Sequence, residues 1–392
     1  MHPGVEGFMY PNEIELQWSV LIVLYPFITG LVAGAFILAS LERVFNVQAV
    51  KPTYRLALLT ALAFMLVAPL PLQLHLGHPE RSFEMLFTPS PTSAMAMFGY
   101  VYLWYLMVVL VVEIWLEYRK DLVLIRRRST GLKRMLYTAL TLGSDNISPA
   151  SLKVDDTVGR LVTIIGVPSA FLLHGYVGFI FGSIKANPWW STPMMPIVFL
   201  FSAIVSGIAA VLVLYMAITK WRGERIDMNC VDTIARYLFY AFLIDFSLEM
   251  LDLIHRMYEA DESFHSLDFM VKTRLFVSQI VIQIVLGTVV PIGALAIVQV
   301  KRLSERTRLQ IYTVSGILTL IGILAMRWNV VIGGQLFSKT FLGYTTYKME
   351  FATREGLLPA ILVMILPLVI LAVLIRVLPP WTAHVEEGHM PR

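Results

Sequence analysis

The chain has 392 residues, of which 57% are hydrophobic and only 15% are charged, and it carries a net charge of +4 at pH 7. Soluble domains have about 25% charged residues, so this composition excludes an ordinary soluble protein and predicts helices that span a membrane. Because Cys230 is the single cysteine, the sequence excludes an internal disulfide and an iron–sulfur cluster held by cysteines of this chain alone.

Apolar segments follow one another along the whole chain. Each is long enough to cross about 30 Å of hydrocarbon as a helix, which predicts an all-α polytopic membrane protein with about nine transmembrane helices. The segments lie at residues 16–43, 53–76, 93–117, 157–183, 194–219, 233–257, 271–299, 309–336 and 356–378.

The connections between these segments alternate in charge. Lys and Arg gather near residues 43–55, 119–134, 220–225 and 301–308, whereas the loops at 77–92, 184–193, 258–270 and 337–353 have few basic residues. Basic loops mark the cytoplasmic side of a membrane. We therefore expect a multi-pass protein of the cell membrane with its N-terminus outside and its C-terminus in the cytoplasm.

The longest connection, 118–156, is predicted to be cytoplasmic. Its stretch at 131–142 is mildly amphipathic, which favours a helix lying in the membrane interface. A tenth crossing here would bury a cluster of basic side chains at 126–128 and 133–134, so we do not expect one.

Small residues recur in the first and fifth apolar segments, as TGLVAG at 29–34 and SGIAA at 206–210. Small residues let spanning helices approach closely. Although chance could produce this similarity, it fits two four-helix bundles and one added helix. The predicted division is a first bundle at 1–183, a second at 184–340, and a C-terminal helix and tail at 341–392.

The sixth segment is unusually rich in ionisable residues. Asp245, Glu249 and Asp252 are spaced to share one helix face, and His255 and Arg256 follow them. A carboxylate at mid-membrane costs at least ~2.5 kcal/mol, so this pattern predicts a proton path from the membrane middle to the outer face. The alternative is structural pairing with basic residues such as Arg327 or Arg274.

Further polar residues lie in the outer half of other segments. His75, His78, Glu80 and Arg81 follow the second segment, either as ligands for a polar head group or as an ordinary polar helix end. Single ionisable residues inside a membrane are candidates for function, and they occur here as His174 in the fourth segment and Arg327, with Asn329 beside it, in the eighth. Tyr25 and Thr29 of the first segment lie at a similar depth.

This convergence fits a ligand that enters from lipid and exchanges protons at the outer face, as a quinone does. Quinone carbonyls need donors such as His, Tyr or Arg within hydrogen-bond reach. Two other functions stay open. Pairs among His75, His78, His174 and His255 could ligate haem b, and acids within helices suit a proton-coupled secondary transporter. A transporter acts alone, whereas a redox anchor copurifies with iron–sulfur subunits.

The order of these motifs resembles the NrfD/PsrC family, the membrane subunits of polysulfide-reductase-like respiratory complexes. Within that family the chain is most similar to the DsrP subgroup of sulfur-metabolising prokaryotes, through YPNEIE at 10–15 and the 327–335 segment. The matching motifs are TGLVAGAF at 29–36, LGHPER at 76–81, HGY at 174–176, PWWSTP at 188–193, RWN at 327–329 and GGQ at 333–335.

The resemblance implies two four-helix bundles, menaquinone bound non-covalently near the outer ends of the first bundle, and no haem or iron–sulfur cluster on this chain. It implies a periplasmic ferredoxin-like iron–sulfur partner and possible proton translocation. For the subgroup it implies a multihaem cytochrome c, a membrane cytochrome b and a cytoplasmic iron–sulfur subunit. We expect these proteins and membrane lipid, not nucleic acid, as partners.

Two sets of site residues follow from the motifs and from the polar residues above. The expected quinone-binding residues are Tyr25, Thr29, His75, His78, Glu80, Arg81 and His174. The expected proton path comprises Asp245, Glu249, Asp252, His255, Arg256, Arg327 and Asn329.

Overall fold

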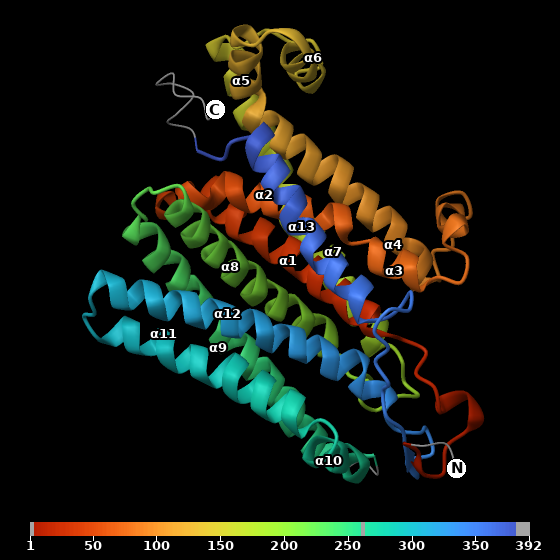
Figure 1. The fold of residues 1–392 in the computed structure, drawn as a ribbon. Coiled ribbons are helices and arrows are strands. Elements are labelled where there is room, and N and C mark those ends of the chain that lie inside the picture. The colour runs from red at the N-terminus through yellow and green to blue at the C-terminus, as the bar shows by residue number, and fades with distance from the viewer. Residues whose placement is uncertain (1–3, 260–262, 382–392) are drawn as a thin grey trace.

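The computed structural model describes residues 4–259 and 263–381, and their regular secondary structure is almost entirely helical (Figure 1). The long elements of the amino-terminal half are α1 (Val20–Arg43), α2 (Lys51–Val67), α3 (Leu70–His75), α4 (Ala94–Leu103), η4 (Trp104–Val111), α5 (Val112–Arg128), α6 (Gly131–Leu140) and α7 (Pro149–Gly182). Those of the other half are α8 (Met195–Trp221), α9 (Met228–Glu259), α10 (Phe264–Lys272), η5 (Phe276–Val289), α11 (Val290–Val300), α12 (Glu305–Val331) and α13 (Leu357–Val377).

Short elements occupy the connections. Two-residue strands β1 (Glu6–Gly7) and β2 (Gly343–Tyr344) pair antiparallel and join the amino-terminal segment to the loop after α12. Tight helical turns lie at η1 (Pro11–Glu13), η2 (Gln48–Val50), η3 (Pro79–Leu86) and η6 (Gly333–Gln335), whereas η4 and η5 are π-helical stretches that continue into α5 and α11.

Within the described part of the chain, eight helical stretches are long and apolar enough to cross a membrane. They correspond to eight of the predicted segments, and the all-α multi-pass fold is confirmed. The remaining segment, 233–257, lies in α9, which is 32 residues long but carries more charged residues. It packs against α8 and α11 in the same bundle (Figure 1). Nine crossings and an external N-terminus stay predictions.

Helix α1 lies at the centre of the molecule, and most of its residues are buried. It contacts α2, α7, α8 and α12. Helices α5 and η4 pack on α7, α9 and α12 pack on α8, and η5 and α11 pack on α12. The division of the chain at residues 183 and 340 into two four-helix bundles remains a prediction.

The small-residue motifs of the first and fifth apolar segments face each other where α1 crosses α8. A methyl group on Gly34 would overlap the carbonyl oxygen of Ala203, and one on Gly207 would overlap the backbone of Gly34. Glycine is needed at both positions because the two backbones are in direct contact.

The connection 118–156 contains the end of α5, the helix α6 and the start of α7. Helix α6 has ten residues, too few to cross the hydrocarbon core. It exposes Leu132, Met135 and Leu136, as an interfacial helix does. Tyr137 points inward, and its hydroxyl donates to the carbonyl of Val377 at the end of α13.

Helix α13, the predicted additional helix, packs along α2 and is fixed at its start to α3. The imidazole of His75 hydrogen-bonds Glu355 at 2.8 Å, and Arg354 donates to the carbonyls of Gln73 and Leu76. The added helix is therefore joined to the first group of helices at both of its ends.

The helices run between two different polar ends. We call the end formed by the start of α1, residues 183–194 and residues 332–347 the amino-terminal face, and the end that holds Arg43, Arg55, Arg119 and Arg308 the basic face. The amino-terminal segment lies at the first of these faces, and α13 ends at the second (Figure 1).

Candidate functional site

A buried polar junction joins four helices near the amino-terminal face. His174 of α7 and Arg327 of α12 are both 0% exposed, and the Nη2 of Arg327 lies 3.1 Å from the Nε2 of His174. The same guanidinium nitrogen donates to the hydroxyl of Ser202 on α8 at 2.6 Å. The other ring nitrogen, Nδ1, lies 3.3 Å from the hydroxyl of Thr29 on α1.

This geometry fixes the tautomer of His174. A guanidinium can only donate hydrogen bonds, so Nε2 must accept, and Nδ1 carries the proton. Nδ1 then donates to Thr29, whose own hydroxyl donates to the carbonyl of Tyr25 at 3.0 Å. Both nitrogens of this neutral imidazole are engaged, which leaves neither of them free for a haem iron.

Arg327 forms no direct ion pair with Asp245 or Glu249, which is one of the pairings that the alternative interpretation named. Its hydrogen bonds go to His174, Ser202 and the carbonyl of Phe199, and its guanidinium lies 4.0 Å from the centroid of the Phe199 ring. Arg274 pairs with Glu6 at the amino-terminal face instead.

The acids of α9 lie along one side of the helix, as predicted. Asp245 is 2% exposed, and its Oδ1 is buried without a hydrogen-bond partner. Glu249 and Asp252, nearer the amino-terminal face, line a cavity, and Thr192 donates to Asp252 at 2.6 Å. His255 is exposed, and the side chain of Arg256 lies outside the described residues.

The cavity has a volume of about 390 Å³ and lies between α9, α10, η5 and α12. Besides the α9 acids, its polar lining includes Gln279, Gln283 and Asn329, with Trp189 from the loop before α8. The glutamines were missed in the sequence because uncharged amides in an apolar segment carry no signal of burial. Their neighbours along the chain are mostly aliphatic, so only the structure shows that they face a cavity.

Two tyrosine hydroxyls near the junction have no hydrogen-bond partner. Tyr25 of α1 is 5% exposed, and the hydroxyls of both Tyr25 and Tyr176 of α7 are buried and unpaired. Tyr25 belongs to a buried apolar cluster against which Tyr176 packs, and Phe98 packs edge-on against Tyr25 at 5.2 Å. Tyr176 follows His174 by two residues, so its motif was visible, but its convergence with Tyr25 required the fold.

Comparison with known proteins identifies the family. The family model described as "Polysulphide reductase, NrfD" matches residues 10–339. The chain belongs to the NrfD family. This confirms the resemblance drawn from the sequence motifs.

Relatives of this NrfD-family chain include proteins named as parts of reductases. It is 26% identical to a subunit of the selenate reductase of Mesobacillus selenatarsenatis, across 89% of this chain and 84% of the relative. It is 29% identical to a putative membrane subunit of the dimethyl sulfoxide reductase of Halobacterium salinarum, across 53% and 46% of the two chains. It is 32% identical to the protein NrfD of Escherichia coli, across 53% and 61%.

The family motif after α2 lies at the surface of the amino-terminal face. His75 contacts Glu355 as described above, His78 hydrogen-bonds Glu80 at 2.9 Å, and Arg81 pairs with Glu84 at 3.0 Å. The side chains of His78 and Arg81 are 75% and 64% exposed. The structure thus brings Tyr25, Thr29 and His174 together in the interior and leaves this motif on the outside.

A second buried cluster, near the basic face, was not anticipated from the sequence. Glu113 is 1% exposed; one carboxylate oxygen accepts from Tyr54 at 3.0 Å and Thr163 at 2.6 Å, and the other has no partner. Thr163 and His174 lie on the same helix, eleven residues or roughly 16 Å apart. The available signal was a pair of acids, Glu113 and Glu117, near the end of the third apolar segment.

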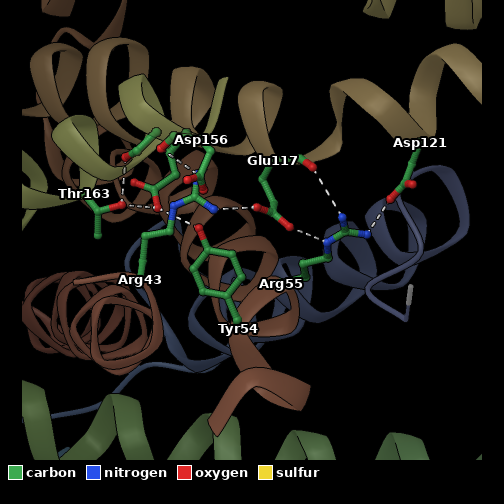
Figure 2. Close-up of polar contacts among 9 residues, drawn as sticks. Arg43, Tyr54, Arg55, Glu117, Asp121, Asp156 and Thr163 are labelled. Carbon is green, nitrogen blue, oxygen red and sulfur yellow. Dashed lines mark hydrogen bonds and ion pairs between the residues drawn. The ribbon is translucent and has the colours of Figure 1, made fainter. Parts of the chain in front are cut away.

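Arginine–carboxylate pairs surround this cluster (Figure 2). Glu117 bridges Arg43 at 3.1 Å and Arg55 at 2.7 Å, and Arg55 reaches Asp121 at 2.5 Å. Because these pairs are partly buried and share partners, they fix α1, α2 and α5 to one another at the basic face. Among the residues that the structure describes, no group of three or more metal-ligating side chains is present.

Proposed function

We propose that this chain is the quinone-interacting membrane subunit of a respiratory electron-transfer complex. The observation that carries the proposal is the pair of buried, unpartnered hydroxyls of Tyr25 and Tyr176. An unpaired buried hydroxyl costs about 1–3 kcal/mol, and a quinone carbonyl is an acceptor that both could donate to. Thr29 and His174, which lie on the same two helices, hydrogen-bond each other.

The residues around Tyr25 and Tyr176 fit menaquinone held between α1 and α7. When bound, menaquinone would supply two-electron redox chemistry coupled to two protons. Tyr25 and Tyr176 would orient the head group, while apolar neighbours such as Phe98 exclude water from it. The surface motif with His75, His78, Glu80 and Arg81 would border the entrance at the amino-terminal face.

Electrons would pass to or from a ferredoxin-like iron–sulfur subunit docked on the amino-terminal face, which we place on the periplasmic side. The relatives named as reductase subunits support a role as the membrane subunit of such a complex. We also propose, from the similarity to the DsrP subgroup, a multihaem cytochrome c, a membrane cytochrome b and a cytoplasmic iron–sulfur subunit as further partners.

Protons would move along the acids of α9. Asp245 has an unpartnered carboxylate oxygen, and Glu249 and Asp252 continue from it to the cavity. Arg327, with Asn329 beside it on the cavity wall, would set the electric field in which these acids exchange protons. His255 would complete the route at the surface, where it is exposed, and Arg256 remains a proposed member.

The experiment is a purification in mild detergent with analysis of copurified subunits and extracted quinone. We expect iron–sulfur subunits and bound menaquinone with the wild-type chain. Combining Tyr25→Phe with Tyr176→Phe should weaken quinone binding at least tenfold, because each lost hydrogen bond contributes about 1 kcal/mol. Tyr102→Phe is the matched control, since that hydroxyl already donates to the carbonyl of Met65.

Two outcomes would contradict the proposal. Haem bands that belong to this chain alone would favour a b-type cytochrome. A partner-free chain that transports a solute without quinone would favour a secondary transporter.

A further inference from the structure

The cavity between α9, α10, η5 and α12 presents acceptors to its interior. Asn329 is 2% exposed, lines the cavity, and has an Oδ1 without a partner. The Oε1 of Gln279 is also buried and unpartnered on the same wall. Since an unmet buried acceptor is costly, the cavity is suited to a ligand that donates hydrogen bonds.

Two donors on this wall are already used. The amide nitrogen of Asn329 donates to the Oε1 of Gln283 at 2.8 Å. The indole nitrogen of Trp189 donates to the backbone carbonyl of Asn329 at 2.9 Å. A ligand that only accepts hydrogen bonds would leave the amide oxygens of Gln279 and Asn329 without a donor.

The acceptors that lack a partner at the cavity are neutral, although three acids, Glu249, Asp252 and Asp268, also line it. Asp252 accepts from Thr192 at 2.6 Å, and Asp268 pairs with Lys272 at 2.6 Å. The acceptors without a partner, Gln279 and Asn329, are neutral amides. A hydroxyl group matches these amides and can also donate to the carboxylate of Glu249.

Most of the cavity wall is apolar, and its size fits a small organic molecule. Trp189 and Phe264 supply aromatic surface, and Met250 and Met326 supply adaptable thioethers. The volume of about 390 Å³ lies within the usual range of ligand pockets. Leu253 and Met257 line it and are 45% and 56% exposed, so the site is open to the apolar tail of a lipid-soluble ligand.

We propose that this cavity is a second ligand site, selective for a hydroquinone: a flat aromatic diol with a hydrocarbon tail. Its two hydroxyls donate to the amide oxygens of Gln279 and Asn329 or to Glu249. The oxidised form lacks these donors and is rejected, because a site built to bind a hydroxyl discriminates strongly against an analogue without it. The site is separate from Tyr25 and Tyr176 and needs no electron transfer.

The test measures equilibrium binding to the full chain in lipid nanodiscs, with both Tyr25→Phe and Tyr176→Phe present to remove the first proposed site. The probes are a short-tailed naphthohydroquinone kept reduced without oxygen, its oxidised quinone, and its dimethyl ether. We expect the diol to bind at least tenfold tighter than the quinone or the ether. Equal binding of the three, or tighter binding of an alkylammonium probe, would overturn the proposal.

Variants locate the binding site. Gln279→Met, at a half-buried wall position, should raise the Kd of the diol about tenfold, and Asn329→Leu should do the same if the variant folds. Gln310→Met makes the same chemical change at an exposed position of α12 and should leave the Kd unchanged. An unchanged Kd in a folded Gln279→Met protein would refute the site, whatever the fate of quinone binding at Tyr25 and Tyr176.

Discussion

At the scale of single residues, Arg327 has the largest fully buried side chain among the described residues, and this side chain is charged. A buried cation is expensive in an apolar interior, and this one is held by His174, Ser202 and the ring and carbonyl of Phe199. Because those partners are neutral, its positive charge stays available to the acids of α9. Arg327 thus links the packing of four helices to the electrostatics of the proposed proton route.

Replacing Arg327 with Ala should destabilise the protein by about 3 kcal/mol or more, because it leaves buried partners unsatisfied and nearby acids without a compensating charge. Thermal unfolding in detergent measures this as a lower Tm. Arg306→Ala, at an exposed position of the same helix, should change the Tm little. A Tm for Arg327→Ala equal to that of the control would show that the junction does not hold the helices together.

Asp245 tests the proton route. Asp245→Asn keeps the shape of the side chain but cannot release a proton, so quinone-linked electron transfer should persist while proton movement in proteoliposomes falls several-fold. Asp227→Asn, which retains a cap for the start of α9, is the control at the opposite end of the helix. An unchanged number of protons per electron in Asp245→Asn would remove Asp245 from the route.

At this scale the sequence was most informative about charges. His174, Arg327 and the α9 acids could be singled out because ionisable residues are rare inside apolar segments. Tyr176, Gln279 and Gln283 could not, because neutral polar residues are common there. Only the fold shows that Tyr176 and Gln279 have unpaired atoms and that Gln283 faces the cavity. The link from Thr29 through His174 to Arg327 joins residues 145 and 153 positions apart, and no local pattern encodes such a pairing.

At the scale of helices, the crossing of α1 and α8 depends on backbone contact at Gly34 and Gly207. Gly34→Ala should destabilise the fold by about 1–3 kcal/mol, because the added methyl group must push the helices apart. Gly293→Ala is the matched control, since a methyl group there meets nothing within 4 Å and alanine favours helix. Folded yield and Tm should fall for the first variant and hold or rise for the second; the reverse order would contradict the contact.

The sequence predicted the apolar helices well because length and hydropathy are sufficient signals for them. It did not predict the short helix α10 or the π-helical stretches η4 and η5, which depend on how neighbouring helices pack. The cavity could not be predicted for the same reason, since its walls come from helices that are distant in the sequence. The small residues of α1 and α8 were recognised, but only the fold shows that they touch.

At the scale of the whole molecule, the two faces differ in chemistry, and this difference predicts the orientation. Arg43, Arg55 and Arg308 on the basic face pair with acids, yet many other Lys and Arg side chains there remain exposed. Because positive charge is retained in the cytoplasm, the amino-terminal face should be periplasmic.

Cysteine labelling measures this directly, because the native Cys230 is buried and should give little background. Lys339→Cys, exposed at the amino-terminal face, should react in intact cells with a membrane-impermeant maleimide. Arg302→Cys, exposed at the basic face, should react only after the membrane is opened. The opposite pattern would reverse the orientation and move the proposed iron–sulfur partner to the cytoplasmic side.

The central claim is that this NrfD-family chain holds a quinone between α1 and α7. Photoaffinity labelling with an oxidised azido-menaquinone, followed by mass spectrometry of the peptides, tests it most directly. We predict labelling of the peptides that contain Tyr25 and Tyr176, and loss of that labelling with excess menaquinone. Labelling that spares both peptides, or that excess menaquinone does not displace, would contradict the account.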